Sequence, residues 1–488
     1  MEKSQHLANP AEDTSDTLDP KDWDKFRTLA HQMVDDSIDR LIGLRNAPVW
    51  RPMPDEVRSV FYSQMPGAGV GPEATYRIFC DAIAPYGSGN LHPRFMGWVQ
   101  GGGTPVGMLA ELLAGALNEN CGGRDHAGIA VERQVIAWSA AMLGFPETAG
   151  GVLVTGSSTA NFIGLLCARR RMLGANVRTG GLNGSQLVGY AQMGVHRCLA
   201  GAFDMAGLGS QALRRIPVDS DYRMNLDALD AQIEADRREG VTPLLVIGTA
   251  GSVDVGAIDN LSKLAEIAAR HDLWFHVDAA FGALAALSAT RRPLLAGIEL
   301  ADSVAFDFHK WAQVQYDAGC ILVRDQNSLL DTFAQKASYL SNTVRGLSRG
   351  APWPCDLGPD LSRSFRALKI WMTFQSYGGN RLGAIIDQTC EIATYLARQI
   401  DAAPDLSLLA PVALNIVCFR YDDGKEGLDD LNTEVVGDLQ EAGSFVPSTT
   451  RIGGRIAIRA AIVNHRTTRR DVDALVKAVT AAGRRRRK

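Results

Sequence analysis

The sequence predicts an α/β protein in which a large lobe with a mainly parallel sheet is joined to a smaller α+β lobe. From about residue 90 to 375, short apolar runs alternate with longer helical patterns, which is typical of parallel strands covered by helices on both faces. After about residue 380 the pattern changes to that of a separate small sheet. A length of 488 residues, with 46% hydrophobic and 21% charged residues, suits such a globular chain.

The opening segment, residues 1–85, is amphipathic but too small to bury its own apolar positions. Residues 1–20 are polar and predict a loose tail, and residues 55–85 predict short helices and connectors. A helix is expected over 22–44, where apolar residues recur at helical spacing before a run of prolines. We therefore expect the apolar face of this segment to cover another part of the assembly, such as a second subunit.

Residues 86–380 are the expected large domain. Ligands of parallel sheets bind beyond the carboxyl ends of the strands, so the residues just after each strand are the candidates for chemistry. The expected strands are 152–155, 187–190, 244–248, 274–277, 304–306 and 320–323, with helices over 161–173, 196–206 and 261–270.

Residues 381–488 are the expected small domain. A helix over 381–402 and a closing helix over 468–482 flank three expected strands, at 415–421, 444–448 and 455–462.

Several classes of protein are excluded by composition. A net charge of −4 gives no sign of nucleic-acid binding. No stretch approaches the roughly 20 continuous apolar residues of a spanning helix, and the polar, acidic first 20 residues do not resemble a signal peptide. The eight cysteines are dispersed, without a CxxC pair. We therefore expect reduced thiols in the cytoplasm, no membrane partner and no metal site.

Small hydroxyl residues follow the first expected strand, in the phrase Thr-Gly-Ser-Ser-Thr-Ala-Asn at 155–161. At the start of a helix, Ser157 and Ser158 can offer N–H and O–H donors to an anion, and the helix dipole adds to them. Ordinary N-capping is the alternative interpretation. A second small turn, which contains Thr249, follows another expected strand.

A carboxylate and a lysine follow two further strands. Asp278 ends the phrase His276-Val-Asp278, where it can pair with a cationic ring nitrogen or cap the next helix. Lys310 directly follows an expected core strand in an aromatic setting, in the phrase Asp307-Phe-His-Lys-Trp. A desolvated lysine has a lowered pKa and a nucleophilic amine, whereas a snorkelling lysine is the structural alternative.

Together these strand ends describe a site for pyridoxal 5′-phosphate (PLP). PLP requires an amine for its Schiff base, an anion for its pyridinium nitrogen and donors for its phosphate. The joint pattern is more specific than any one of its parts.

At these residues the chain resembles the group II PLP-dependent amino-acid decarboxylases, the family of the aromatic-L-amino-acid, histidine and glutamate decarboxylases. The resemblance runs in order from about residue 22 to 480. It implies the fold type I architecture of PLP-dependent transferases, a segment exchanged across a homodimer, and a small C-terminal domain. The matching phrases are 92–95 (His-Pro-Arg-Phe), 155–161, 249–251, 276–280, 307–311, 364–369 and 459–468.

The resemblance implies a role for each matched residue around the cofactor. Lys310 is then the Schiff-base lysine, Asp278 the partner of the pyridine nitrogen, and His196 the histidine that stacks on the ring. Other matched positions contact the phosphate or line the cofactor: Ser157, Ser158, Thr249, Ala280 and His309. For the substrate, Phe95 and Trp98 match pocket positions and suggest an aromatic or apolar side chain, and Arg459 matches an arginine that meets the substrate carboxylate.

The implied activity is decarboxylation of an L-amino acid to an amine and CO2. In the aromatic decarboxylases a loop tyrosine delivers the proton, but the corresponding stretch here, 344–357, contains none. Its glycines and prolines predict a flexible lid, and Tyr339, His196 or water remain as donors. Two alternatives stay open: a decarboxylating aldehyde synthase, which releases aldehyde, ammonia and peroxide, and a non-catalytic PLP-binding protein.

Overall fold

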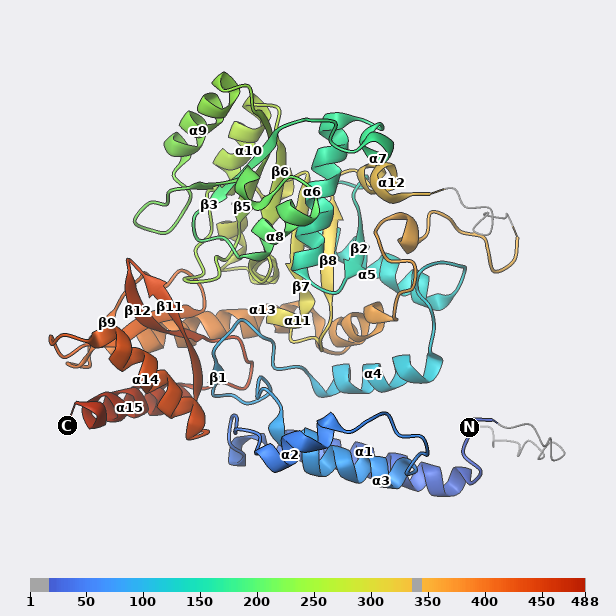
Figure 1. Cartoon of the computed structure of the whole chain (residues 1–488), viewed down its shortest axis with the longest axis vertical. Coiled ribbons are helices and arrows are strands. Elements are labelled where there is room, and N and C mark those ends of the chain that lie inside the picture. The colour runs from blue at the N-terminus through green and yellow to red at the C-terminus, as the bar shows by residue number, and fades with distance from the viewer. Residues whose placement is uncertain (1–16, 336–344, 488) are drawn as a thin grey trace.

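The computed structural model describes residues 17–335 and 345–487. At its centre is a seven-stranded sheet, and Figure 1 shows how the helices surround it. β8 runs antiparallel to both of its neighbours and the other pairs are parallel, so the mainly parallel sheet is confirmed. In spatial order the strands are β2 (Gly150–Val154), β8 (Gly319–Val323), β7 (Ser303–Asp307), β6 (Trp274–Asp278), β5 (Thr242–Thr249), β3 (Leu187–Gln192) and β4 (Leu213–Ile216).

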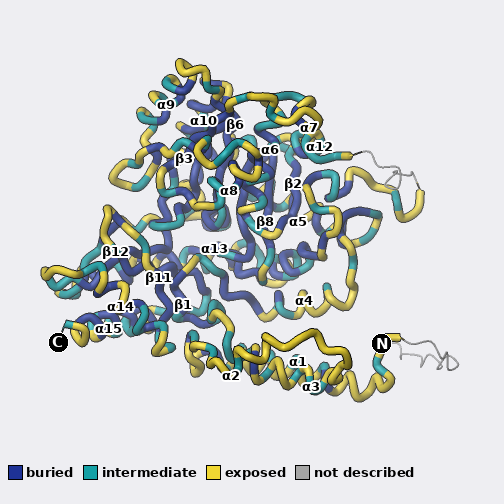
Figure 2. The backbone as a smooth tube through the Cα atoms, in the orientation of Figure 1, coloured by how far each residue is buried: buried dark blue, intermediate teal, exposed yellow. Residues whose placement is uncertain are grey.

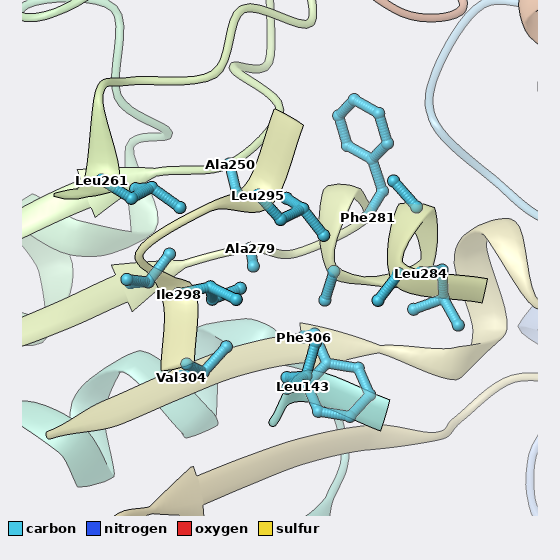
Figure 3. Packing of buried hydrophobic residues seen from close by; sticks show 14 of the residues in the cluster. Leu143, Ala250, Leu261, Ala279, Phe281, Leu284, Leu295, Ile298, Val304 and Phe306 are labelled. Atoms are coloured by element: carbon cyan, nitrogen blue, oxygen red, sulfur yellow. The ribbon is translucent and has the colours of Figure 1, made fainter. Parts of the chain in front are cut away.

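Helices cover both faces of this sheet. Neighbouring residues of a strand point to opposite faces, so a strand of consecutive apolar residues presents an apolar surface on each side. In β2, Leu153 packs into one hydrophobic cluster while Val152 and Val154 pack into the other. The first cluster is covered by α5 (Ala127–Leu143), α9 (Leu226–Arg238) and α10 (Leu261–Arg270), and part of it is drawn in Figure 3. The second is covered by α6 (Ser157–Leu173), α8 (Cys198–Met205) and α12 (Asn327–Phe333).

The N-terminal segment forms a separate layer beneath α4 (Pro105–Leu117). Its main helix, α1 (Trp23–Ile42), is capped by the side chain of Asp22 and confirms the helix expected over 22–44. Leu29 is the one buried residue of α1, and most of this layer is exposed (Figure 2). The short elements that follow α1 are η1 (Leu44–Asn46), α2 (Asp55–Ser59), η2 (Val60–Tyr62), α3 (Pro72–Ile78), η3 (Phe79–Ile83) and η4 (Ala84–Tyr86).

The small lobe is a five-stranded sheet packed against α14 (Leu428–Glu441) and α15 (Arg469–Arg486). One strand comes from the expected large domain: β1 (Phe95–Met96) pairs in parallel with β11, which departs from the boundaries expected from the sequence. The spatial order is β1, β11 (Val446–Ile452), β12 (Arg455–Ala461), β10 (Ile416–Tyr421) and β9 (Leu406–Leu408).

The two lobes share the long α13 (Arg366–Asp401), which kinks at Gly378, where φ is 73°. The expected boundary after residue 380 lies two residues beyond this kink. The remaining short elements are α7 (Val177–Gly180), η5 (Ser210–Ala212), η6 (Gly282–Leu287), η7 (Arg292–Leu295), η8 (Ile298–Leu300), α11 (Phe308–Trp311) and η10 (Pro354–Asp356).

Within the two described ranges, no helix combines the length and the apolar character needed to cross a membrane. The same residues contain no group of three or more His, Cys, Asp or Glu side chains placed to hold a metal ion.

A buried ion pair supports the edge strand of the large sheet. Arg363 donates to both carboxylate oxygens of Glu132, at 2.9 and 2.6 Å, and both side chains are almost fully buried. The backbone of Leu153 in β2 completes the group, since its N–H donates to Glu132 and its carbonyl accepts from Arg363. The pair therefore satisfies backbone groups that β2 presents on the side without a neighbouring strand.

We predict that Arg363→Met lowers the free energy of unfolding by about 3–5 kcal/mol, because it leaves the Glu132 carboxylate buried without its cation. Urea denaturation measures the change. Arg171→Met is the control: Arg171 pairs with Asp272 on the surface, and its loss should cost less than about 1 kcal/mol. Equal losses of unfolding free energy in the two variants would contradict a stabilising role for the buried Arg363–Glu132 pair.

Candidate functional site

A cavity of about 510 Å³ lies at the carboxyl ends of the parallel strands, within the size range of small-molecule sites. It is bordered by residues from both lobes, with β12 supplying the contribution of the small lobe. Its lining includes Trp98, Val99, Gln100, Thr155, Gly156, Ser157, Ser158, His196, Cys198, Thr249, Gly251, Val253, Asp278, Ala280, Phe281, Asp307, His309, Lys310, Tyr316 and Arg459.

Lys310, in the short α11, is held by Asp307, the last residue of β7. The Lys310 Nζ lies 2.8 Å from Asp307 Oδ2. The same carboxylate accepts the backbone N–H of Ser157 at 2.6 Å and its hydroxyl at 2.8 Å. Both donors of Ser157, expected to meet a phosphate, are thus bound to Asp307. At the start of α6, Ser158 is exposed, borders the cavity and is the serine that can meet an anion.

Asp307 was not predicted as a site residue, although it lies in the phrase that contains Lys310. Its position at the end of a buried strand was the available signal, because a buried carboxylate needs partners. The structure provides them from α6 and from the lysine three residues later.

Asp278 ends β6 and lies in register with Thr249 of β5. Its carboxylate is buried, which raises its pKa, while the charges of Lys310 and His196 oppose that shift. Next to it, the hydroxyl of Thr249 is buried and has no hydrogen-bond partner among the described residues. A carboxylate and an unpaired hydroxyl therefore border the cavity side by side.

His196 lies in the loop between β3 and α8 and borders the same cavity. Its Nδ1 accepts the backbone N–H of Cys198 at 3.3 Å, so the neutral ring carries its proton on Nε2. Burial lowers the pKa of His196, which favours this neutral form.

His309 is buried beside Lys310. Its Nδ1 accepts the N–H of Ala318 at 3.0 Å, and burial lowers its pKa to about 4, so the ring is neutral at pH 7. Its ring is covered by Tyr316, with ring centroids 4.2 Å apart. Tyr316 was not predicted, since it lies in a loop without a periodic pattern.

The three expected substrate residues are placed differently. Trp98 is half-exposed and borders the cavity, whereas Phe95 lies in β1 and packs with Val49 and Val446 in the core. The expectation for Phe95 is therefore corrected: Phe95 is paired in β1 and does not border the cavity, and its ring centroid lies 5.9 Å from that of Trp98, which does.

Arg459 projects from β12 to the cavity wall and is buried. It donates to the carbonyls of Gly97 at 2.7 Å, Val253 at 2.6 Å and Asp254 at 3.2 Å, and no carboxylate in the described part of the chain pairs with it. Burial lowers its pKa, so a carboxylate ligand here would relieve an uncompensated cation.

The loop before α4 lies directly against the turn that carries Lys310. Gly101 donates its N–H to the carbonyl of His309 at 3.1 Å. A Cβ at Gly101 would lie 2.4 Å from the Lys310 carbonyl and 2.5 Å from that of His309. Only glycine permits this approach, which sets the position of Trp98 three residues earlier.

The residues of this cavity fit PLP. Lys310 provides an amine, Asp278 a buried anion, and Ser158 and Thr249 polar groups with capacity to bind a ligand, while His196 and Ala280 border the space for a ring. The described part of the expected lid, 345–357, contributes nothing to the lining. It contacts α5 instead, where Arg133 donates to the carbonyl of Pro352 at 2.9 Å. Tyr339 lies outside the described residues.

Comparison with known proteins agrees with this interpretation. Residues 79–422 match the family model described as the pyridoxal-dependent decarboxylase conserved domain. The chain is 30% identical to an aromatic-L-amino-acid decarboxylase of Bacillus atrophaeus, over 94% of this chain and 95% of the relative. It is 27% identical to a phenylacetaldehyde synthase of Arabidopsis thaliana, over 91% and 93%.

Among solved structures, the fold is similar to that of Oryza sativa TDC with PLP and tryptamine. The TM-score is 0.88 at 25% sequence identity, covering 96% of this chain and 99% of the other.

We predict that Gly101→Ala displaces the loop from Lys310, lowers the free energy of unfolding by about 1–3 kcal/mol and weakens PLP binding. Denaturation and equilibrium dialysis measure the two effects. Gly437→Ala, in α14 with open space around the added carbon, should reduce neither. Unchanged stability and PLP affinity in Gly101→Ala would show that the loop position is unimportant.

Proposed function

The chain belongs to the pyridoxal-dependent decarboxylase family, and from this premise we propose that it converts an aromatic or apolar L-amino acid into the amine and CO2. One observation carries the proposal: the amine of Lys310 and the buried carboxylate of Asp278 face a single cavity at the strand ends. When bound through the amine of Lys310, PLP supplies an acceptor for the electrons that remain on the substrate carbon as CO2 leaves.

Asp278 would serve this chemistry by keeping a proton on the pyridine nitrogen. An adjacent anion favours the cationic form of a ring nitrogen, and the cationic ring in turn keeps the buried carboxylate ionised. His196, whose ring is neutral and borders the same space, would pack against the face of the cofactor ring and limit access of water.

The substrate side of the site combines a cation with apolar walls. Arg459 lacks a carboxylate partner in the described chain and is available to orient the substrate carboxylate. Trp98, Val253 and Phe281 border the cavity and would contact an apolar or aromatic side chain. Similar proteins include an aromatic-L-amino-acid decarboxylase and a structure with PLP and tryptamine, and both support this substrate class.

The test is to incubate the full-length enzyme with each of the twenty amino acids and measure CO2. We expect release from aromatic or apolar substrates. Release from acidic amino acids alone would overturn the substrate class, and no release from any would favour the non-catalytic alternative.

A decarboxylating aldehyde synthase is the second candidate. It is favoured by the absence of a tyrosine from residues 344–357 and by similarity to a phenylacetaldehyde synthase. In that reaction O2 and water are consumed, and aldehyde, CO2, ammonia and hydrogen peroxide are formed. Amine, aldehyde and peroxide measured together, with and without oxygen, separate the two activities.

We also infer that two copies associate through the N-terminal layer and α4. Figure 2 marks most residues of the N-terminal layer as exposed. The surface formed by this layer and α4 carries many large apolar side chains that are exposed, which a stable monomer rarely presents. Its members are Trp23, Phe26, Ile38, Ile42, Val60, Phe61, Tyr62, Met65, Val70, Ile78, Phe79, Ile83, Leu109, Leu112, Leu113 and Leu117. A two-fold dimer would cover the same patch on both copies.

The eight cysteines are all unpaired in the structure, which supports a reducing compartment such as the cytoplasm.

We predict that Leu112→Glu converts the proposed dimer into a monomer, because it places a charge among the exposed apolar residues of this surface. Sedimentation equilibrium reports the mass directly. Leu300→Glu is the matched control, since Leu300 is exposed to a similar degree, 52% against 57%, but lies outside this surface. A Leu112→Glu protein that stays dimeric would place the interface elsewhere.

We predict that Asp278→Asn retains PLP, more weakly, while turnover falls roughly 100-fold or more, the scale of losing a strong electrostatic contact to the transition state. CO2 release and equilibrium dialysis measure the two quantities. Asp272→Asn, an exposed site with the same change in net charge, should leave both unchanged. Near-normal turnover in Asp278→Asn would show that this carboxylate only caps a helix and does not support the reaction.

A further inference from the structure

The hydroxyl of Tyr316 is a polar group at the cavity that none of the roles above uses. Tyr316 lies in the loop between α11 and β8 and is 48% exposed toward the cavity. In residues 17–335 and 345–487, nothing forms a hydrogen bond with its hydroxyl. Its ring is fixed, however, because it packs on His309 with an interplanar angle of 34°.

His309 places Tyr316 at one particular end of the cavity. A Cβ at Gly156, the residue before α6, would lie 3.7 Å from Cε1 of His309, so the imidazole is next to the N-terminus of α6. We call the group Gly156, Ser158, His309 and Tyr316 the anion end. Asp278, which suits a ring nitrogen, is on a different strand, β6.

The anion end is short of donors. Ser157 gives both its donors to Asp307, and the N–H of Thr159 is bound to the carbonyl of Gly156 at 3.0 Å. The ring of His309 is neutral and already accepts at Nδ1, which leaves one N–H on Nε2.

The charge at this end also opposes an anion. The carboxylate of Asp307 lies at the same helix terminus, and its counter-ion is Lys310, the amine that PLP itself requires. A phosphate brings a further charge of about −1.5 to −2 to this position. Ser158 and Thr155, which border the same end of the cavity, offer only uncharged hydroxyls to that charge. A further uncharged donor would therefore strengthen phosphate binding.

We propose that Tyr316 donates its hydroxyl hydrogen to the phosphate of PLP and is therefore a cofactor-binding residue of this chain. A phenol is a strong donor to a charged oxygen, and the packing on His309 orients it before the cofactor arrives. The inference concerns cofactor binding and is independent of which amino acid is decarboxylated.

The protonation state of Tyr316 is consistent with this role. Burial of part of the ring and the nearby charge of Asp307 both raise the pKa of the phenol. The hydroxyl therefore retains its hydrogen at neutral pH, where it is needed as a donor.

The experiment compares PLP with pyridoxal, which has the same ring and aldehyde but no phosphate. The full-length protein is freed of cofactor with hydroxylamine and titrated with each compound in equilibrium dialysis. Tyr316→Phe keeps the ring on His309 and removes only the hydroxyl. Tyr222→Phe, at a half-buried tyrosine outside the cavity lining, is the matched control.

We expect Tyr316→Phe to raise the Kd for PLP by roughly tenfold, the typical loss for one hydrogen bond to a charged group, and to leave the Kd for pyridoxal within about twofold. Tyr222→Phe should change neither. Equal weakening of both compounds would assign Tyr316 to packing, and an unchanged PLP affinity would exclude a bond to the phosphate; either result overturns the proposal.

Discussion

The carboxylate of Asp307 joins three parts of the molecule that must be held in register. It ends β7, accepts two hydrogen bonds from Ser157 at the start of α6, and lies 2.8 Å from the amine of Lys310. A negative charge at a helix N-terminus is stabilised by the helix dipole, and a buried carboxylate with several donors holds its position firmly. Because Asp307 contacts both groups, it fixes the distance between the Lys310 amine and the N-terminus of α6. The loop at Gly101 then packs on the resulting turn and brings Trp98 to the cavity.

Much of the large lobe could be predicted from the sequence because its strands are buried on both faces and therefore appear as continuous apolar runs. The end of each run marks the carboxyl end of a strand. The carboxyl ends of parallel strands lie together, so Lys310 and Asp278 could be assigned to one site before any contact was known. β4 was missed since it carries Arg214 and Arg215 in its centre, and β1 since two residues form a strand only when Val446 is there to pair with them.

Side-chain direction was the main limit of the sequence-based predictions for the site. Phe95 and Trp98 are three residues apart, and only the pairing of β1 decides which of them faces the cavity. The use of both Ser157 donors by Asp307, and the stacking of Tyr316 on His309, connect residues that no spacing rule relates. These contacts are also the ones that determine how much of the anion end is available to a ligand.

The pairing of β1 with β11 has a consequence for the order in which the living cell completes this enzyme. Phe95 and Val446 are separated by about 350 residues of chain, and a ribosome adds roughly 5–20 residues per second. Trp98 and Arg459 therefore cannot border a common cavity until roughly 20–70 s after the first of them is synthesised. Until then the nascent chain exposes unfinished sheet edges to chaperones, and cofactor binding can stabilise only the finished protein.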